Sequence, residues 1–125
     1  MLTARFIILL TAILVGGCRD LGPTTERDHV EMIQKQLGGE MEVTVAGGRA
    51  DLVTKDIAWE VEFASNWKSS IGQALWYGLQ TNKKAGIILI KRAEKENRYV
   101  IQLGSALQHG NLEEAVEVMV WPDDF

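Results

Sequence analysis

Several residue types are scarce in this chain, and each scarcity narrows the functions that remain open. Cys18 is the only cysteine, so no disulfide can form within these residues. The two histidines, His29 and His109, have no cysteine or histidine partner at zinc spacing. The sequence also lacks a P-loop, a dinucleotide-binding glycine fingerprint and a serine-hydrolase elbow. These absences exclude a disulfide framework, a zinc finger and the commonest nucleotide-binding and hydrolase motifs.

Basic residues are fewer than acidic ones. The chain has 13 lysines and arginines against 17 aspartates and glutamates, for a formal net charge of −4. Proteins that bind nucleic acid regardless of sequence use clustered lysine and arginine to neutralise phosphates. The net negative charge therefore disfavours sequence-independent binding of nucleic acid. It does not exclude a metal-assisted site for a small target.

The longest apolar run, FIILLTAILV over residues 6–15, is too short to span a bilayer as a helix. It has the length of a signal-peptide hydrophobic region. The following LVGGC, ending at Cys18, resembles the lipobox of bacterial lipoproteins. That resemblance implies a signal peptide over 1–17, a lipidated Cys18 with a tether over 18–25, and anchoring in a bacterial membrane. Arg19 after the cysteine implies the periplasmic face of the outer membrane; the alternative is an ordinary, non-lipid cleavage site.

Residues 26–125 have the length and patterning of one α/β domain. Apolar periodicity and turn residues predict alternating helices and strands. The predicted elements, in order, are a helix over 26–38, strands over 41–46, 49–54 and 57–64, a helix over 66–81, a strand over 85–91, a helix over 94–109 and a strand over 116–121. This α-β-β-β-α-β-α-β order predicts a mixed central sheet flanked by helices.

Polar side chains gather on one face of the three-strand segment. If both connecting turns are two residues long, Asp51 lies opposite Glu60, Arg49 opposite Glu62, and Thr44 opposite Asp51. Because side chains alternate across a sheet, all five share one face. Adjacent carboxylates repel and lose hydration, and Mg²⁺ or Mn²⁺ is the oxygen-preferring ion that would offset this cost. The plainer interpretation is a solvated polar face without a ligand.

This order of elements, with Asp51 on the second strand and Glu60 on the third, resembles the PD-(D/E)XK nuclease superfamily, which has the restriction-endonuclease-like fold. Its exonuclease-like branch carries a Q-x-x-x-Y pair on the next helix, matched here by Gln73 and Tyr77. The resemblance implies Asp51 and Glu60 as Mg²⁺ or Mn²⁺ ligands, with Gln73 and Tyr77 in the same site. An acid from the first helix is a further member in that branch, and Glu26 occupies a suitable position.

The resemblance breaks where the superfamily expects a lysine, because this chain has Glu62. Glu62 is then an additional ligand, or Arg49 or Lys68 supplies the missing positive charge, or an Arg49–Glu62 ion pair leaves the site inactive. Two functions follow from these alternatives. The first is a metal-dependent phosphodiesterase that acts on nucleic acid. The second is an inactive relative that serves as a binding or envelope-associated protein. Residues 61–90 also look like part of a group of small bacterial proteins of this superfamily.

Overall fold

The computed structural model describes residues 22–125. The predicted signal peptide over 1–17 and the predicted lipidation site Cys18 lie outside this range. The described elements, in chain order, are α2 (Glu26–Leu37), β1 (Glu40–Val45), β2 (Gly48–Val53), β3 (Ile57–Phe63), a 3₁₀ segment η1 (Ala64–Ser69), α3 (Ser70–Thr81), β4 (Lys84–Ile90), a 3₁₀ turn η2 (Glu94–Glu96), α4 (Asn97–His109) and β5 (Val116–Trp121).

The five strands form one mixed sheet in the order β1-β2-β3-β4-β5. The first three strands form an antiparallel meander, whereas β3, β4 and β5 run parallel to one another. Parallel neighbours require crossover connections, which α3 and α4 supply. The α/β class and the mixed sheet flanked by helices are therefore confirmed.

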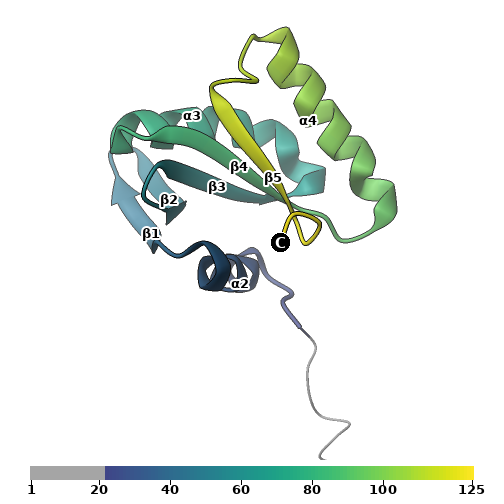
Figure 1. The fold of residues 1–125 in the computed structure, drawn as a ribbon, viewed down its shortest axis with the longest axis horizontal. Helices are drawn as coiled ribbons and strands as arrows, with labels where there is room; N and C mark the ends of the chain where they lie inside the picture. Colours follow the sequence, from purple (N-terminus) through teal and green to yellow (C-terminus); the bar gives the residue numbers. More distant parts are fainter. Residues whose placement is uncertain (1–21) are drawn as a thin grey trace, which may run out of the picture.

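Helices cover both faces of the sheet (Figure 1). On one face α2 packs through Val30 and Ile33 against a buried cluster that includes Leu52 and Ile88. On the other face α3 and α4 pack against the opposite side of β4. Between Ala85 and Ile90 every β4 residue is buried, as expected for a strand covered on both sides.

The first hairpin differs by one residue per strand from its predicted register. Thr44 pairs with Arg49, not with Asp51, and Val45 pairs with Gly48. The turn is therefore Ala46–Gly47, and Gly47 adopts the positive φ of 76° that such a turn requires. Gly48 belongs to the strand, where a Cβ atom would come within 3.0 Å of the Tyr77 hydroxyl.

The second hairpin has the predicted register. Leu52 pairs with Trp59 and Val53 with Ala58, which places Asp51 and Glu60 at the next position of the same register. The ladder stops before that position. There the Asp51 carboxylate accepts a hydrogen bond of 2.8 Å from the backbone N–H of Val61. A side chain thus replaces backbone pairing where the two strands separate.

Two predicted helices begin later than the sequence pattern indicates. The segment predicted as a helix from residue 66 starts as the 3₁₀ segment η1, because Asn66 has non-helical angles of φ −106° and ψ 21°. The true α3 begins at Ser70. Similarly, the turn η2 precedes α4. Short 3₁₀ turns at helix ends preserve the side-chain periodicity closely enough to be read as helix from sequence.

Candidate functional site

Two carboxyl groups face each other at the point where β2 separates from β3. Asp51 ends the paired part of β2, and Glu60 lies on β3 beside it, with only 3% of its surface exposed. The two carboxyl groups lie close enough to perturb each other's pKa. Two neighbouring carboxylates have no donor to offer each other, so a proton on one of them would relieve the repulsion.

Burial and mutual repulsion perturb the acidity of both groups. Burial raises the pKa of Glu60 to about 9, and the charges of Asp51, Glu62 and Glu26 add to this rise. Burial also raises the pKa of Asp51, although the hydrogen bond from the Val61 N–H opposes the rise. Glu60, whose pKa rises to about 9, is therefore the carboxyl group of this pair that favours its protonated form.

A second acid pair, Glu26 and Glu62, adjoins the first. Burial raises the pKa of Glu26 to about 7, and the charges of Glu62 and Asp51 contribute to the rise. Glu62 accepts the backbone N–H of Phe63 at 2.9 Å. The structure thus brings together the four predicted acids, Glu26, Asp51, Glu60 and Glu62.

The start of α2 positions Glu26. Thr25 caps the helix by accepting the N–H of Asp28 at 3.0 Å, and the Asp28 carboxylate accepts the N–H of Thr25 at 3.2 Å. This reciprocal capping box fixes where the first turn begins. Glu26 is the first helical residue, so the cap sets the position of its carboxyl group over the other three acids.

Two residues that the sequence analysis missed, Arg27 and Glu42, complete the wall of this site. The Arg27 guanidinium contacts the Glu42 carboxylate at 2.8 Å and ties α2 to β1. Glu42 has a positive φ of 56°, which is rare for a residue with a side chain. A polar residue inside a strand was the available signal. Its unusual backbone conformation has no counterpart in the sequence pattern.

The helix pair Gln73 and Tyr77 lies beside the acids. The Tyr77 hydroxyl donates to the Gln73 side-chain oxygen at 3.4 Å. Tyr77 is buried, and burial followed by the negative charge of Glu60 raises its pKa. Gln73 is exposed, and its amide group donates to the Ser69 carbonyl at 3.3 Å. Tyr77 therefore contributes a hydroxyl near the carboxylates, while Gln73 orients that hydroxyl from outside.

The two candidate cations have different surroundings. Arg49 lines a small hollow together with Glu26, Arg27 and Asp51, and its charge opposes the rise in the Asp51 pKa. Lys68 is exposed, with its ammonium 5.9 Å from the centre of the Trp67 ring. Within residues 22–125, no ion pair forms between Arg49 and Glu62.

The four acids lie as two neighbouring pairs, Glu60 beside Asp51 and Glu26 beside Glu62. Among residues 22–125, no group of three or more aspartate, glutamate, histidine or cysteine side chains has the geometry of a ready cation site. Mg²⁺ usually takes only one or two protein carboxylates and keeps several waters. One carboxyl pair can therefore supply the protein ligands of such an ion once both of its carboxyl groups are ionised.

Comparison with known proteins identifies two similar sequences, both from a giant virus. They are KilA-N domain-containing proteins of Acanthamoeba polyphaga mimivirus. One is 47% identical over 58 residues, which cover 46% of this chain and 16% of the relative. The other is 37% identical over 54 residues, which cover 43% of this chain and 22% of the relative. No family model and no solved structure matches the chain.

These similarities correct the assignment made from sequence motifs. The similar proteins are viral and are named for a KilA-N domain, so kinship with bacterial lipoproteins and with PD-(D/E)XK nucleases is overturned. The predicted bacterial envelope location, the lipoprotein keywords and the envelope-anchored nuclease function are overturned with it. The motifs misled because short patterns such as Q-x-x-x-Y and a lipobox-like LVGGC recur by chance. In the part of the chain that the structure describes, no helix is long and apolar enough to cross a membrane. The chain is similar to a limited part of two viral KilA-N domain-containing proteins.

Proposed function

We propose that this chain binds a divalent cation, Mg²⁺ or Mn²⁺, between Asp51 and Glu60. The supporting observation is the placement of buried Glu60 beside Asp51 at the point where β2 and β3 separate, with the pKa of both carboxyl groups raised by burial. Glu26 and Glu62 form a second acid pair that raises the negative potential there. The two predicted ligands thereby become part of a group of four neighbouring acids, called the four-acid pocket below, in which Glu26 and Asp51 line a small hollow.

Electrostatics favours either a proton or a metal ion at this position. Burying several carboxylates side by side is costly unless their charge is neutralised. In the metal-free protein, protons on Glu60 and Glu26 provide that neutralisation. A divalent cation would neutralise two charges at once and would prefer the hard oxygen ligands that the pocket offers. Cation binding would therefore displace the protons on Glu60 and Glu26.

The proposed function is binding and includes no cleavage step. A cation held by one or two carboxylates keeps coordination positions for water and for an anionic group such as a phosphate. Nucleic acid is the phosphate-bearing partner we propose for the bound cation, which would offset the acidic charge of the chain. The names of the relatives support a role within a larger viral KilA-N domain-containing protein. The matched residues cover 16% and 22% of the length of those relatives, so a shared activity of the whole proteins is also a proposal.

The architecture adds little to this functional argument. A restriction-endonuclease-like arrangement of the sheet stays a prediction, since no solved structure matches the chain. Similar arrangements carry unrelated functions, so function has to be argued from the site itself. The four-acid pocket therefore carries the proposal.

Thermal unfolding of the full chain with increasing Mn²⁺ tests the cation site. A ligand that binds only the folded state at a hundredfold excess over its Kd adds about 2.7 kcal/mol of stability. We expect Mn²⁺ to raise the melting temperature of the native chain and Asp51→Asn to remove most of that rise. Glu31→Gln is the matched control, because Glu31 lies on the exposed side of α2 and pairs only with Arg27.

Equal melting shifts in the native chain, Asp51→Asn and Glu31→Gln would show that Mn²⁺ acts outside the pocket. The nucleic-acid partner is tested separately by measuring the binding of a labelled DNA duplex with Mn²⁺ and with a chelator. Binding that does not depend on Mn²⁺ or on Asp51 would remove the partner from the proposal while leaving the cation site intact.

A further inference from the structure

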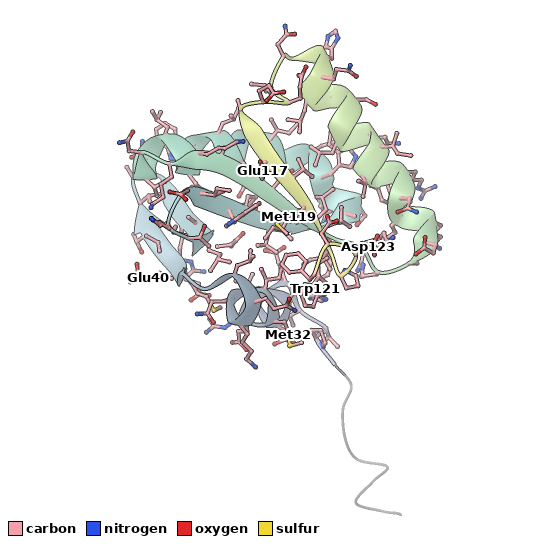
Figure 2. The ribbon with its side chains drawn as sticks, in the orientation of Figure 1. Met32, Glu40, Glu117, Met119, Trp121 and Asp123 are labelled. Atoms are coloured by element: carbon pink, nitrogen blue, oxygen red, sulfur yellow. The ribbon has the colours of Figure 1, made fainter. Side chains whose placement is uncertain are left out.

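Among residues 22–125, the strand β5 forms one edge of the sheet and has no strand on its outer side. It pairs in parallel with β4 over six successive residues, from Ala85 opposite Val116 to Ile90 opposite Trp121. Figure 2 shows Glu117, Met119 and Trp121 along this strand, with Glu117 and Trp121 toward its two ends. An edge strand has a row of backbone groups that can pair with another chain.

Hydrogen bonds at the end of β5 reveal which residues point outward. The Trp121 carbonyl accepts the N–H of Lys91, so Trp121 faces β4. Val120 faces the other way. Its N–H donates to the Asp124 carboxylate at 2.7 Å, and its carbonyl accepts the Asp124 N–H at 2.9 Å. Alternation along the strand then directs the backbone groups of Val118 and Val116 outward.

Only the middle of this edge remains open. The C-terminal turn hydrogen-bonds the N–H and the carbonyl of Val120, and the Leu112 carbonyl accepts the Val116 N–H at 3.0 Å. Among the described residues, no turn or side chain hydrogen-bonds the Val118 N–H, the Val118 carbonyl or the Val116 carbonyl. Three such groups suffice for a short added strand.

The opposite edge of the sheet is protected differently. In β1 the positive φ of Glu42 interrupts the strand, and no pair forms between Glu42 and Asp51. Glu42 is also tied to Arg27 of α2. Irregular backbone and charged side chains are common means of blocking an edge. By contrast, β5 is regular throughout its six pairs.

A hollow beside the open part of β5 can receive a side chain. It has a volume of about 230 Å³ and lies between α4 and β5. Its apolar lining comes from Leu107, Val116 and Val118, and Glu113 is an acidic residue that also lines it. At the α4 side of the hollow, a Cβ atom on Gly104 would meet no other atom within 4 Å.

Acidic residues flank the open edge at both ends. Glu113 and Glu114 precede β5, and Asp123 and Asp124 follow it. A second copy of this chain paired antiparallel along β5 would bring the first pair of acids close to the second pair. Like charges placed opposite each other disfavour such pairing. The same acids would attract a strand that carries positive charges at its ends.

We propose that the edge of β5 binds an extended peptide segment with an apolar centre flanked by lysine or arginine. The segment adds a strand to the sheet, pairing with Val116 and Val118, and places one apolar side chain in the hollow below Gly104. Backbone pairing supplies affinity in this type of recognition, while the hollow and the charges supply selectivity. The site lies on the opposite side of the sheet order from β1 and does not depend on the cation pocket.

Binding of two labelled peptides to the full chain, followed by fluorescence anisotropy, tests the proposal. One peptide is Lys-Lys-Val-Thr-Val-Thr-Val-Lys-Lys, and the other has glutamate in place of each lysine. We expect the lysine-flanked peptide to bind about tenfold more tightly at low salt, chiefly through Glu113 and Glu114, because Asp123 already pairs with Lys91 and Asp124 already accepts the Val120 N–H. Val118→Pro removes the outward N–H without removing a bond to β4, and should weaken binding about fivefold or more.

A second variant keeps the test decisive if Val118→Pro fails to fold. The double substitution Glu113→Lys, Glu114→Lys changes exposed side chains and should abolish or reverse the preference between the two peptides. Absence of binding by either peptide would overturn the proposal. Unchanged binding to a folded Val118→Pro protein, or a concentration-dependent dimer lost in that variant, would overturn it as well.

Discussion

At the scale of single residues, the acids of the pocket are the most unusual feature of the molecule. Glu60 is almost fully buried, and burial together with the charges of neighbouring acids raises its pKa to about 9. Asp51, next to it, accepts the backbone N–H of Val61, which opposes the rise of its own pKa. The two neighbouring carboxyl groups therefore differ in acidity, because a backbone N–H stabilises the charge of Asp51.

The raised pKa of Glu60 predicts how the stability of the metal-free protein depends on pH. From its ordinary pKa of 4.5 up to about 9, folded Glu60 holds a proton that the unfolded chain has lost. The folded state then binds more protons than the unfolded state, so stability falls as the pH rises through this window. Glu26, with a pKa of about 7, adds to the fall over a narrower range.

Glu60→Gln tests this dependence, because glutamine has the shape of a protonated glutamate and stays neutral at any pH. With a chelator present at about pH 8, we expect Glu60→Gln to be at least ~1 kcal/mol more stable than the native chain, and the advantage to shrink near pH 5. Urea unfolding at the two pH values measures it. Glu31→Gln should differ from the native chain by less than ~0.5 kcal/mol at both. A pH-independent advantage would contradict the assignment of the proton to Glu60.

At the scale of elements, close packing of β4 against β3 depends on one glycine. A Cβ atom on Gly86 would come within 2.4 Å of the Trp59 ring and 2.6 Å of the Ile57 side chain. Trp59 is itself buried, so its ring has little room to move. The missing side chain of Gly86 is therefore what allows a tryptophan to pack over the adjacent strand.

Gly86→Ala should destabilise the protein by about 1–3 kcal/mol, the usual cost of overpacking a core. Gly72→Ala is the matched comparison, because a Cβ atom at this position in α3 meets nothing within 4 Å. We expect Gly72→Ala to stabilise the protein by about 0.5–1 kcal/mol through helix propensity. Chemical denaturation compares the two variants. Similar effects of both would show that Trp59 moves aside readily.

The two hairpins differ in how well their registers can be predicted from the sequence. The second hairpin register is confirmed although Lys55-Asp56 suits a primed turn poorly, whereas Gly47-Gly48 suits one well. The first register was wrong because Ala46-Gly47 and Gly47-Gly48 are both plausible turns, and packing of Gly48 against Tyr77 decides between them. Local sequence carries no information on that tertiary contact.

The candidate site shows the same division. The proximity of Asp51 and Glu60 followed from counting residues along a hairpin. The approach of Glu26 depends on how α2 packs across the sheet, and only a resemblance suggested it. The overturned kinship shows that the correct neighbours of a residue can be predicted even when the family is not.

At the scale of the whole molecule, a buried lysine joins parts of the chain that are distant in sequence. The Lys91 ammonium follows β4 and contacts Asn97 at 3.0 Å, at the start of α4. It also contacts Glu94 at 3.3 Å and Asp123 at 2.5 Å, beyond the end of β5. The hydrogen bond to Asp123 is the main reason that the pKa of Lys91 is raised.

Lys91→Met keeps the side-chain length and removes these three contacts. We expect a loss of about 1–3 kcal/mol in unfolding free energy, since Asp123 and Glu94 are exposed enough to regain water. Lys95→Met, at an exposed position of η2, should change stability by less than ~0.5 kcal/mol. Urea unfolding measures both. An equal effect at the two positions would indicate that lost positive charge, and not the contact network, sets the stability.

The change from antiparallel to parallel pairing at β3 has a consequence for how the chain folds. Strands β1, β2 and β3 are joined by tight turns, so their pairing closes only short loops. Strand β4 cannot join until α3 has crossed the sheet, and β5 must wait for α4. Slow, long-range contacts of this kind limit folding rates. Asp51 and Glu60 would then meet early, in a nascent meander that is still wet, before later helices impose the burial that makes their charges costly.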